Sequence, residues 1–246
     1  MRFESLPLVD LMIEYYGLPR GFERFQEYIR LLTGDSKDDM QIPIVAFNPM
    51  GKEHVLDKLN ELKLIDAEKI ISNCISEINP EIIGQNADRI FKVSLSLADV
   101  LKGGWTNRYT TDYQTKFNNS AFLKRNFCTV MFWTSDEITV DLVLARTREF
   151  LYRTIYQLEH TKPETLEEHI RQEAYVSNKA NPYPGTKIED LDYYQIIYEL
   201  NHTTIYYPFI FNFLYGDKAA MDLGYTPIGI KEDFAGFKFA DILEKV

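Results

Sequence analysis

The stretch RIFKVSLSLAD, residues 89–99, decides the core of the fold because apolar and polar side chains alternate strictly along it. One face would carry four apolar side chains and the other three polar ones: Phe91, Val93, Leu95, Leu97, and Lys92, Ser94, Ser96. A period of two is typical of a β-strand that turns one face to the core. We therefore predict a strand over these residues.

A second strand is predicted at QIPIVAFN, residues 41–48, because a short apolar run is bounded there by turn-forming residues. Helical patterns separate the two segments. Strands that are joined through a helix can pair in parallel, so the two segments would form a small sheet of that kind.

The best-defined helix begins at TSDE, where Thr134 and Glu137 have the spacing of a capping box. We predict a continuous helix over residues 135–159 with one buried apolar face. That face would consist of Val140, Val143, Leu144, Leu151, Ile155 and Leu158. The opposite face is polar and is expected to contact solvent: Asp141, Arg146, Arg148, Glu149, Arg153 and Gln157.

Most of the remaining chain also has helical patterns. Asn48 as N-cap and Pro49 at the first helical position predict one helix, and a capping box of Thr161 with Glu164 predicts another. The fold class predicted is mainly α, an α+β fold with a minor two-strand component, in one compact multi-helix domain over residues 1–246. The alternative is a division near residues 98–104, into an α/β part over 1–100 and a helical part over 105–246.

Composition narrows the classes of partner. The chain has 246 residues and a formal net charge of −10, without a cluster of Lys and Arg. Nucleic acids and anionic membranes are bound by basic surfaces, so both are disfavoured as partners. The most apolar run, residues 205–215, is about half as long as a membrane helix. Without signal-peptide character at the N-terminus, and with only Cys74 and Cys128 as cysteines, a soluble, reduced, cytoplasmic protein is expected.

The candidate ligand site is LKGGWTNRYTTDYQ, residues 101–114, which follows the strand of the opening stretch. Trp105 could stack on a planar ligand, Asn107 could orient it, and the guanidinium of Arg108 could grip a carboxylate or phosphate. Two glycines before Trp105 permit close approach of the backbone.

Tyr109 and Asp112 would assist this site. The alternative interpretation is structural: the glycines make a turn, Trp105 packs in the core, and Arg108 pairs with Asp112 across one helical turn. A second candidate is FNPMGKEH, residues 47–54, where free N–H groups at a helix start and the charge of Lys52 would attract an anion. Its spacing is not that of a Walker motif, and an ordinary capped helix is the alternative.

The third candidate is a metal site. His169 and Glu173 are four residues apart on one predicted helix, and His202 could supply a third ligand. The dispersed histidines favour an exposed His–Glu pair instead, so neither a metal nor another cofactor is expected.

Three functions therefore stay open. The first is binding or conversion of a small anionic or aromatic molecule in a cleft near Trp105, Asn107 and Arg108. The second is a non-enzymatic interaction protein that forms a homo-oligomer, because aromatic residues make up 14% of the chain. The third is a metal-dependent hydrolase that uses His169 and Glu173.

Overall fold

The computed structural model describes residues 1–34, 39–82, 84, 88–101, 106–180 and 187–243. These residues belong to two compact units. The first unit comprises Met1–Thr111 and Ser120–Phe150, and the second comprises Asp112–Asn119 and Leu151–Val246.

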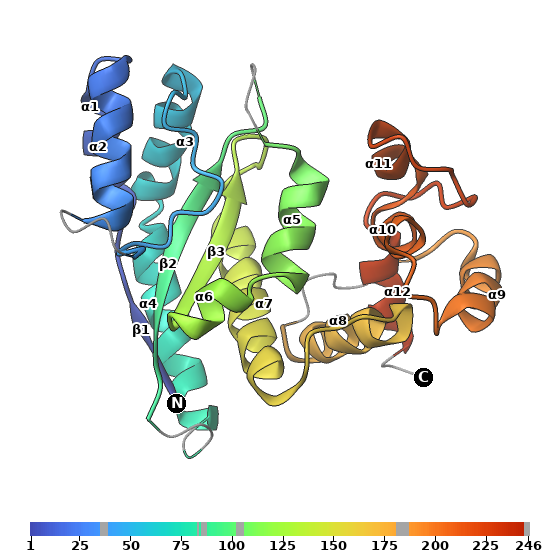
Figure 1. The fold of residues 1–246 in the computed structure, drawn as a ribbon. Helices are drawn as coiled ribbons and strands as arrows, with labels where there is room; N and C mark the ends of the chain where they lie inside the picture. Colours follow the sequence, from blue (N-terminus) through green and yellow to red (C-terminus); the bar gives the residue numbers. More distant parts are fainter. Residues whose placement is uncertain (35–38, 83, 85–87, 102–105, 181–186, 244–246) are drawn as a thin grey trace. The chain divides into compact units, whose positions relative to one another are not determined.

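The first unit is built on a parallel sheet of three strands, which Figure 1 shows running side by side. The strands are β1 (Arg2–Ser5), β2 (Ile90–Ala98) and β3 (Phe127–Trp133), in that order. β2 is central and pairs in register with both neighbours, Phe3 with Phe91 and Val93 with Cys128. The strand predicted over the alternating stretch is thus confirmed, and every side chain of β2 from Val93 onward is buried.

Helices connect the three strands. Among the described residues, four α-helices and a 3₁₀-helix lie between β1 and β2: α1 (Val9–Gly17), α2 (Phe22–Thr33), α3 (Glu53–Leu64), α4 (Ala67–Ile78) and η1 (Asn79–Ile82). The described part of the connection from β2 to β3 has two helices, α5 (Arg108–Phe117) and α6 (Ser120–Lys124). The predicted start of a helix at Pro49 is wrong, because α3 begins at Glu53 with Lys52 as its N-cap.

The strand predicted over residues 41–48 is also wrong: this segment is irregular. Its backbone carbonyls accept hydrogen bonds from side-chain hydroxyls of the sheet, the Val45 carbonyl from Ser96 and the Pro43 carbonyl from Thr129. Pro43 has no N–H to donate to a strand, and Ala46 has a φ of 53°, outside the β region. The segment is apolar because it covers the sheet.

The long helix α7 (Val140–Glu159) begins at Val140 and not at the predicted residue 135. The capping residue is Thr139, whose Oγ1 accepts from the Leu142 N–H, whereas Thr134 donates to Asp99. Val143, Leu151 and Ile155 are buried as predicted, but Val140 is exposed. Arg153 is buried, which contradicts the expectation of a solvated polar face.

The second unit contains five further helices in its described residues: α8 (Leu166–Ala180), α9 (Leu191–Asn201), α10 (Tyr207–Tyr215), α11 (Asp217–Asp222) and α12 (Ala235–Leu243). The capping box of α8 is formed by Thr165 and Glu168, not by Thr161 and Glu164 as predicted. Oγ1 of Thr165 accepts a hydrogen bond from the Glu168 N–H, and the Glu168 carboxylate accepts one from the Thr165 N–H. Aromatic rings fill the core, as where Phe213 and Phe239 pack edge to face.

The predicted fold class, mainly α with a minor strand component, is confirmed, with three strands in the described residues in place of two. The prediction of one domain over the whole chain stays a prediction.

Candidate functional site

The carboxyl end of β2 leads into a buried aspartate, Asp99, on which several donors converge. Nε2 of His54 lies 2.8 Å from Oδ1, and Nδ2 of Asn48 donates to Oδ2 at 2.9 Å. The hydroxyl of Thr134, directly after β3, and the N–H of Leu101 also donate to Oδ1. Parallel sheets commonly bind ligands at the carboxyl ends of their strands, so the surroundings of Asp99 are a candidate site.

Burial by itself would raise the pKa of Asp99, but hydrogen bonds from His54 and Asn48 lower it below its ordinary value. Asp99 is therefore a carboxylate at neutral pH. Nδ1 of His54 is buried and has no hydrogen-bond partner among the described residues. Because Asp99 binds both Asn48 and His54, it ties Asn48 to the first turn of α3.

A pocket of about 190 Å³ lies next to this cluster, between the end of α1, the start of α2 and the start of α3. Three cations line it together with one carboxylate and four uncharged residues: Arg20, Arg24, Lys52, Glu53, Tyr16, Leu18, Gly51 and Leu56. We call it the basic pocket. Tyr16 links it to the Asp99 cluster, because its hydroxyl donates to the Asn48 carbonyl at 2.6 Å.

Arg24 is the central feature of the basic pocket. Although it lies on the otherwise poorly buried helix α2, its side chain is 3% exposed. The guanidinium lies over the rings of Tyr15 and Tyr16, with its carbon 5.1 and 4.5 Å from the two centroids. Nε and Nη2 of Arg24 have no hydrogen-bond partner among the described residues. A buried donor without a partner costs about 1–3 kcal/mol, so Arg24 is held in the wall of the basic pocket at a cost in stability.

The start of α3 supplies the opposite wall of the basic pocket. Lys52 is the N-cap and makes no side-chain hydrogen bond to the helix, so the first-turn N–H groups are not capped in the usual way. Gly51 is required for close approach, because a Cβ there would lie 2.9 Å from Val55 Cγ2 and 3.0 Å from the Tyr16 hydroxyl. The pKa of Glu53 is lowered, first by its own backbone N–H and then by the charges of Arg20 and Lys52.

The residues predicted as a ligand site are placed as follows. Trp105 and the two glycines before it lie outside the described residues. Asn107 is the N-cap of α5, because its Oδ1 accepts from the Thr110 N–H at 3.0 Å. Arg108 donates to the Ser135 hydroxyl and forms an ion pair of 3.4 Å with Asp136, while its guanidinium lies over the ring of Trp133.

Tyr109 is half-buried in the first turn of α5. Asp112 is buried and belongs to the second unit, where it accepts from the Tyr215 hydroxyl at 2.8 Å and forms an ion pair with Lys116 at 3.2 Å. The structure thus gives Asn107 and Asp112 structural contacts, and the pocket predicted near Trp105 stays a prediction.

The residues of the predicted metal site are engaged in other contacts. The two ring nitrogens of His169 lie within hydrogen-bond distance of the Tyr113 hydroxyl and the Thr165 carbonyl. The Glu173 carboxylate accepts two hydrogen bonds from Arg153. Within the part of the chain that the structure describes, no group of three or more His, Cys, Asp and Glu side chains could hold a metal ion.

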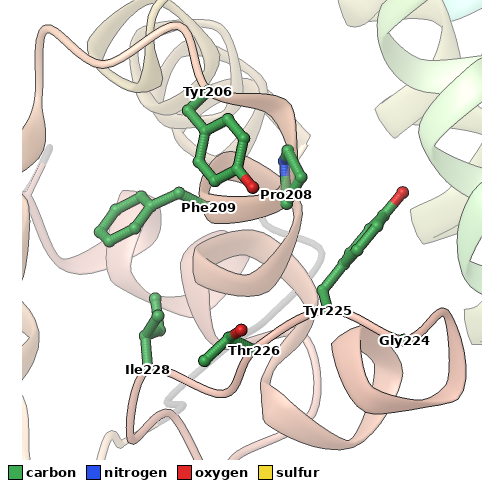
Figure 2. A pocket seen from close by; sticks show the side chains of 7 residues that line it. All are labelled: Tyr206, Pro208, Phe209, Gly224, Tyr225, Thr226 and Ile228. Carbon is green, nitrogen blue, oxygen red and sulfur yellow. The ribbon is translucent and has the colours of Figure 1, made fainter.

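The second unit has a pocket of its own, of about 180 Å³. Figure 2 shows Tyr206, Pro208 and Phe209 on one side of it and the segment from Gly224 to Ile228 on the other. Its lining carries no charged side chain. We call it the aromatic pocket.

Sequence reasoning identified one wall of the basic pocket, Lys52 and the helix start, but missed Arg20, Arg24 and the Asp99 cluster. Arg24 has no distinguishing pattern in the sequence, since a charged residue in the first turn of a helix usually contacts solvent. The one available signal was the pair of tyrosines at the end of the preceding helix, Tyr15 and Tyr16, on which a guanidinium can stack.

No protein-family model, curated protein or solved structure matches this chain. None of the described helices is long and apolar enough to cross a membrane.

Proposed function

We propose that the first unit binds a small anionic molecule in the basic pocket. The observation that carries this proposal is Arg24, a buried arginine in the pocket wall whose Nε and Nη2 have no acceptor among the described residues. Nε and one terminal nitrogen of a guanidinium form the fork that grips a carboxylate or phosphate with two parallel hydrogen bonds.

The charges in the pocket favour a ligand of two negative charges. Arg20, Arg24 and Lys52 supply three positive charges and Glu53 one negative charge, which leaves a local excess of two. The protein as a whole has a net charge of −10 and therefore does not attract anions non-specifically. Attraction of an anion has to come from the local positive charges of the pocket. A phosphate or sulfate group matches both the charge and the fork.

The test is thermal denaturation of the full chain with inorganic phosphate, sulfate, acetate or chloride at constant ionic strength. A ligand that binds only the native state raises the melting temperature by mass action. Phosphate and sulfate should raise it, and acetate and chloride should raise it less.

The decisive variant is Arg24→Met, which keeps the stem of the side chain and removes its charge. Without added anion it should be as stable as the wild type or more so, because replacing a buried charge by an apolar group of similar volume is often neutral or stabilising. Its response to phosphate should be lost. Arg171→Met, an exposed arginine in the second unit, is the matched control and should keep the response. An equal response of the Arg24→Met variant, or no response of the wild type to any anion, would contradict the proposal.

A further inference from the structure

Helix α9 carries a second apolar face that the fold of its unit does not use. Tyr194 is buried and packs on Phe239, and Tyr198 packs on the same ring. These contacts fix the inner face of α9. Ile196 and Leu200 lie on the other side, 54% and 76% exposed, and exposed Tyr193 precedes them at helical spacing.

Two further exposed apolar side chains follow the helix. Ile205 and Tyr206 follow α9 and are 72% and 65% exposed, and Tyr206 is part of the lining of the aromatic pocket. Tyr193 connects the two parts, because its hydroxyl donates to the carbonyl of Ile228, which also lines that pocket. We call these five residues, Tyr193, Ile196, Leu200, Ile205 and Tyr206, the α9 face. Exposed apolar side chains beside a pocket for an anchoring side chain are typical of a protein-binding site.

The segment that carries the α9 face has acidic side chains but no lysine or arginine. No Lys or Arg occurs from residue 188 to residue 217. Asp192 and Glu199 are seven residues apart and exposed, and helical periodicity puts both on the edge next to Ile196. Glu189 and Asp190 add two more exposed acidic side chains before the helix.

We infer that the α9 face binds an amphipathic helix of a partner protein whose apolar stripe is bordered by Lys or Arg. Such a helix would lay its apolar residues along Ile196 and Leu200, put one of them into the aromatic pocket, and pair its cations with Asp192 and Glu199. A second copy of this chain fits less well. A symmetric dimer brings the same face of both copies together, and this face has no cation to meet its own acidic edge.

The experiment uses the full chain and two synthetic helical peptides with identical leucine positions. One peptide has lysine and the other glutamate at the positions that border the stripe. Fluorescence anisotropy of labelled peptides should show binding of the lysine peptide and about tenfold or more weaker binding of the glutamate peptide, since like charges at an interface are repelled. Equal affinities, or no binding of the lysine peptide, would overturn the inference.

Two pairs of substitutions localise the effect. Ile196→Ser with Leu200→Ser should weaken binding of the lysine peptide by about tenfold or more, as truncation of interface anchors does. Asp192→Asn with Glu199→Gln should weaken binding of the lysine peptide, whereas binding of the glutamate peptide should stay the same or become stronger. Leu64→Ser is the control, because Leu64 is 86% exposed on α3 of the first unit. If sedimentation shows a dimer of the wild type that the Ile196/Leu200 variant lacks, the face belongs to a second copy and the inference is overturned.

Discussion

At the scale of single residues, the energetics of Arg24 separate a binding role from a structural one. Its stacking on Tyr15 and Tyr16 contributes about 1–2 kcal/mol, which does not offset a cost of about 1–3 kcal/mol for each of the two nitrogens without an acceptor. A purely structural site is better served by an apolar side chain. An arginine at this position gains a clear advantage only when an anion completes its hydrogen bonds.

Glu53 provides a test of charge in the same pocket. Its lowered pKa keeps it ionised at neutral pH, so it repels an anion that approaches Arg20 and Lys52. Glu53→Gln should therefore tighten phosphate binding by about three- to tenfold, the effect of one unit charge at close range in water. Titration calorimetry measures the change, and Glu61→Gln, farther along the same helix, is the control that should leave affinity unchanged. Weaker binding by the Glu53→Gln variant would assign Glu53 to ligand contact instead.

His169 predicts a pH dependence of stability. Burial lowers the pKa of its imidazole below 6.5, because the charged form loses hydration inside the second unit. A lowered pKa in the folded state means that the unfolded chain binds the proton more tightly, so this contribution to stability is present above pH 6.5 and is lost as the pH falls below it. The slope is at most about 1.4 kcal/mol per pH unit. Urea unfolding between pH 7.5 and pH 5 should show this slope in the wild type. The slope should be absent from the His169→Gln variant and present in the His202→Gln control. An equal slope in all three proteins would contradict the prediction.

At the scale of elements, a buried ion pair joins α7 to α8. Arg153 and Glu173 are 1% and 4% exposed and are held by two hydrogen bonds, of 3.0 and 2.6 Å. Glu173→Gln should lower the free energy of unfolding by about 3–5 kcal/mol, because it removes one charge of a buried, hydrogen-bonded ion pair. The double variant Arg153→Met, Glu173→Met should recover most of that loss. A cost below about 1 kcal/mol for the single substitution, measured by urea unfolding, would show that the pair is not electrostatically important.

The elements also show how far local pattern determines structure. Alternation predicted β2 although both of its faces are buried, because Ser94 and Ser96 keep the polar period while their hydroxyls bond to carbonyls of the covering segment. The strand FCTVMFW, residues 127–133, was missed because a strand buried on both faces has no alternation to detect. The capping box of α8 was displaced because Thr161 and Thr165 both have a glutamate three residues on. At α7 the capping-box spacing of Thr134 was misleading, because Thr134 donates to Asp99 and Thr139, which has no glutamate at that spacing, caps the helix.

The candidate site follows the same rule. Lys52 and the helix start were visible in the sequence because an anion site at a helix start is a local arrangement. Arg24 and Asp99 were not visible, since their burial depends on residues far along the chain, such as Asn48 beside Asp99 at 2.9 Å. The site is assembled by the fold, from segments that share no motif.

At the scale of the whole molecule, the chain passes between the two compact units three times, after Thr111, Asn119 and Phe150. Two of these crossings fall inside helices, in α5 and in α7, so neither unit contains either helix completely. If one unit unfolded alone, its part of the helix would unfold with it, and the part that remains in the other unit would lose stabilising hydrogen bonds. We therefore expect the units to unfold in one cooperative transition, as the prediction of a single domain requires.

Two substitutions in α7 test this expectation. Val143 is buried in the first unit and Leu151 in the second, both without exposed surface. Leu151→Ala should cost about 2–5 kcal/mol and Val143→Ala less, as truncation of core side chains does. Each should shift the whole unfolding curve, measured both by circular dichroism and by tryptophan fluorescence, to which Trp133 of the first unit contributes. If Leu151→Ala shifts the circular dichroism curve and leaves part of the fluorescence change at its original midpoint, the two units unfold separately and the chain has two domains.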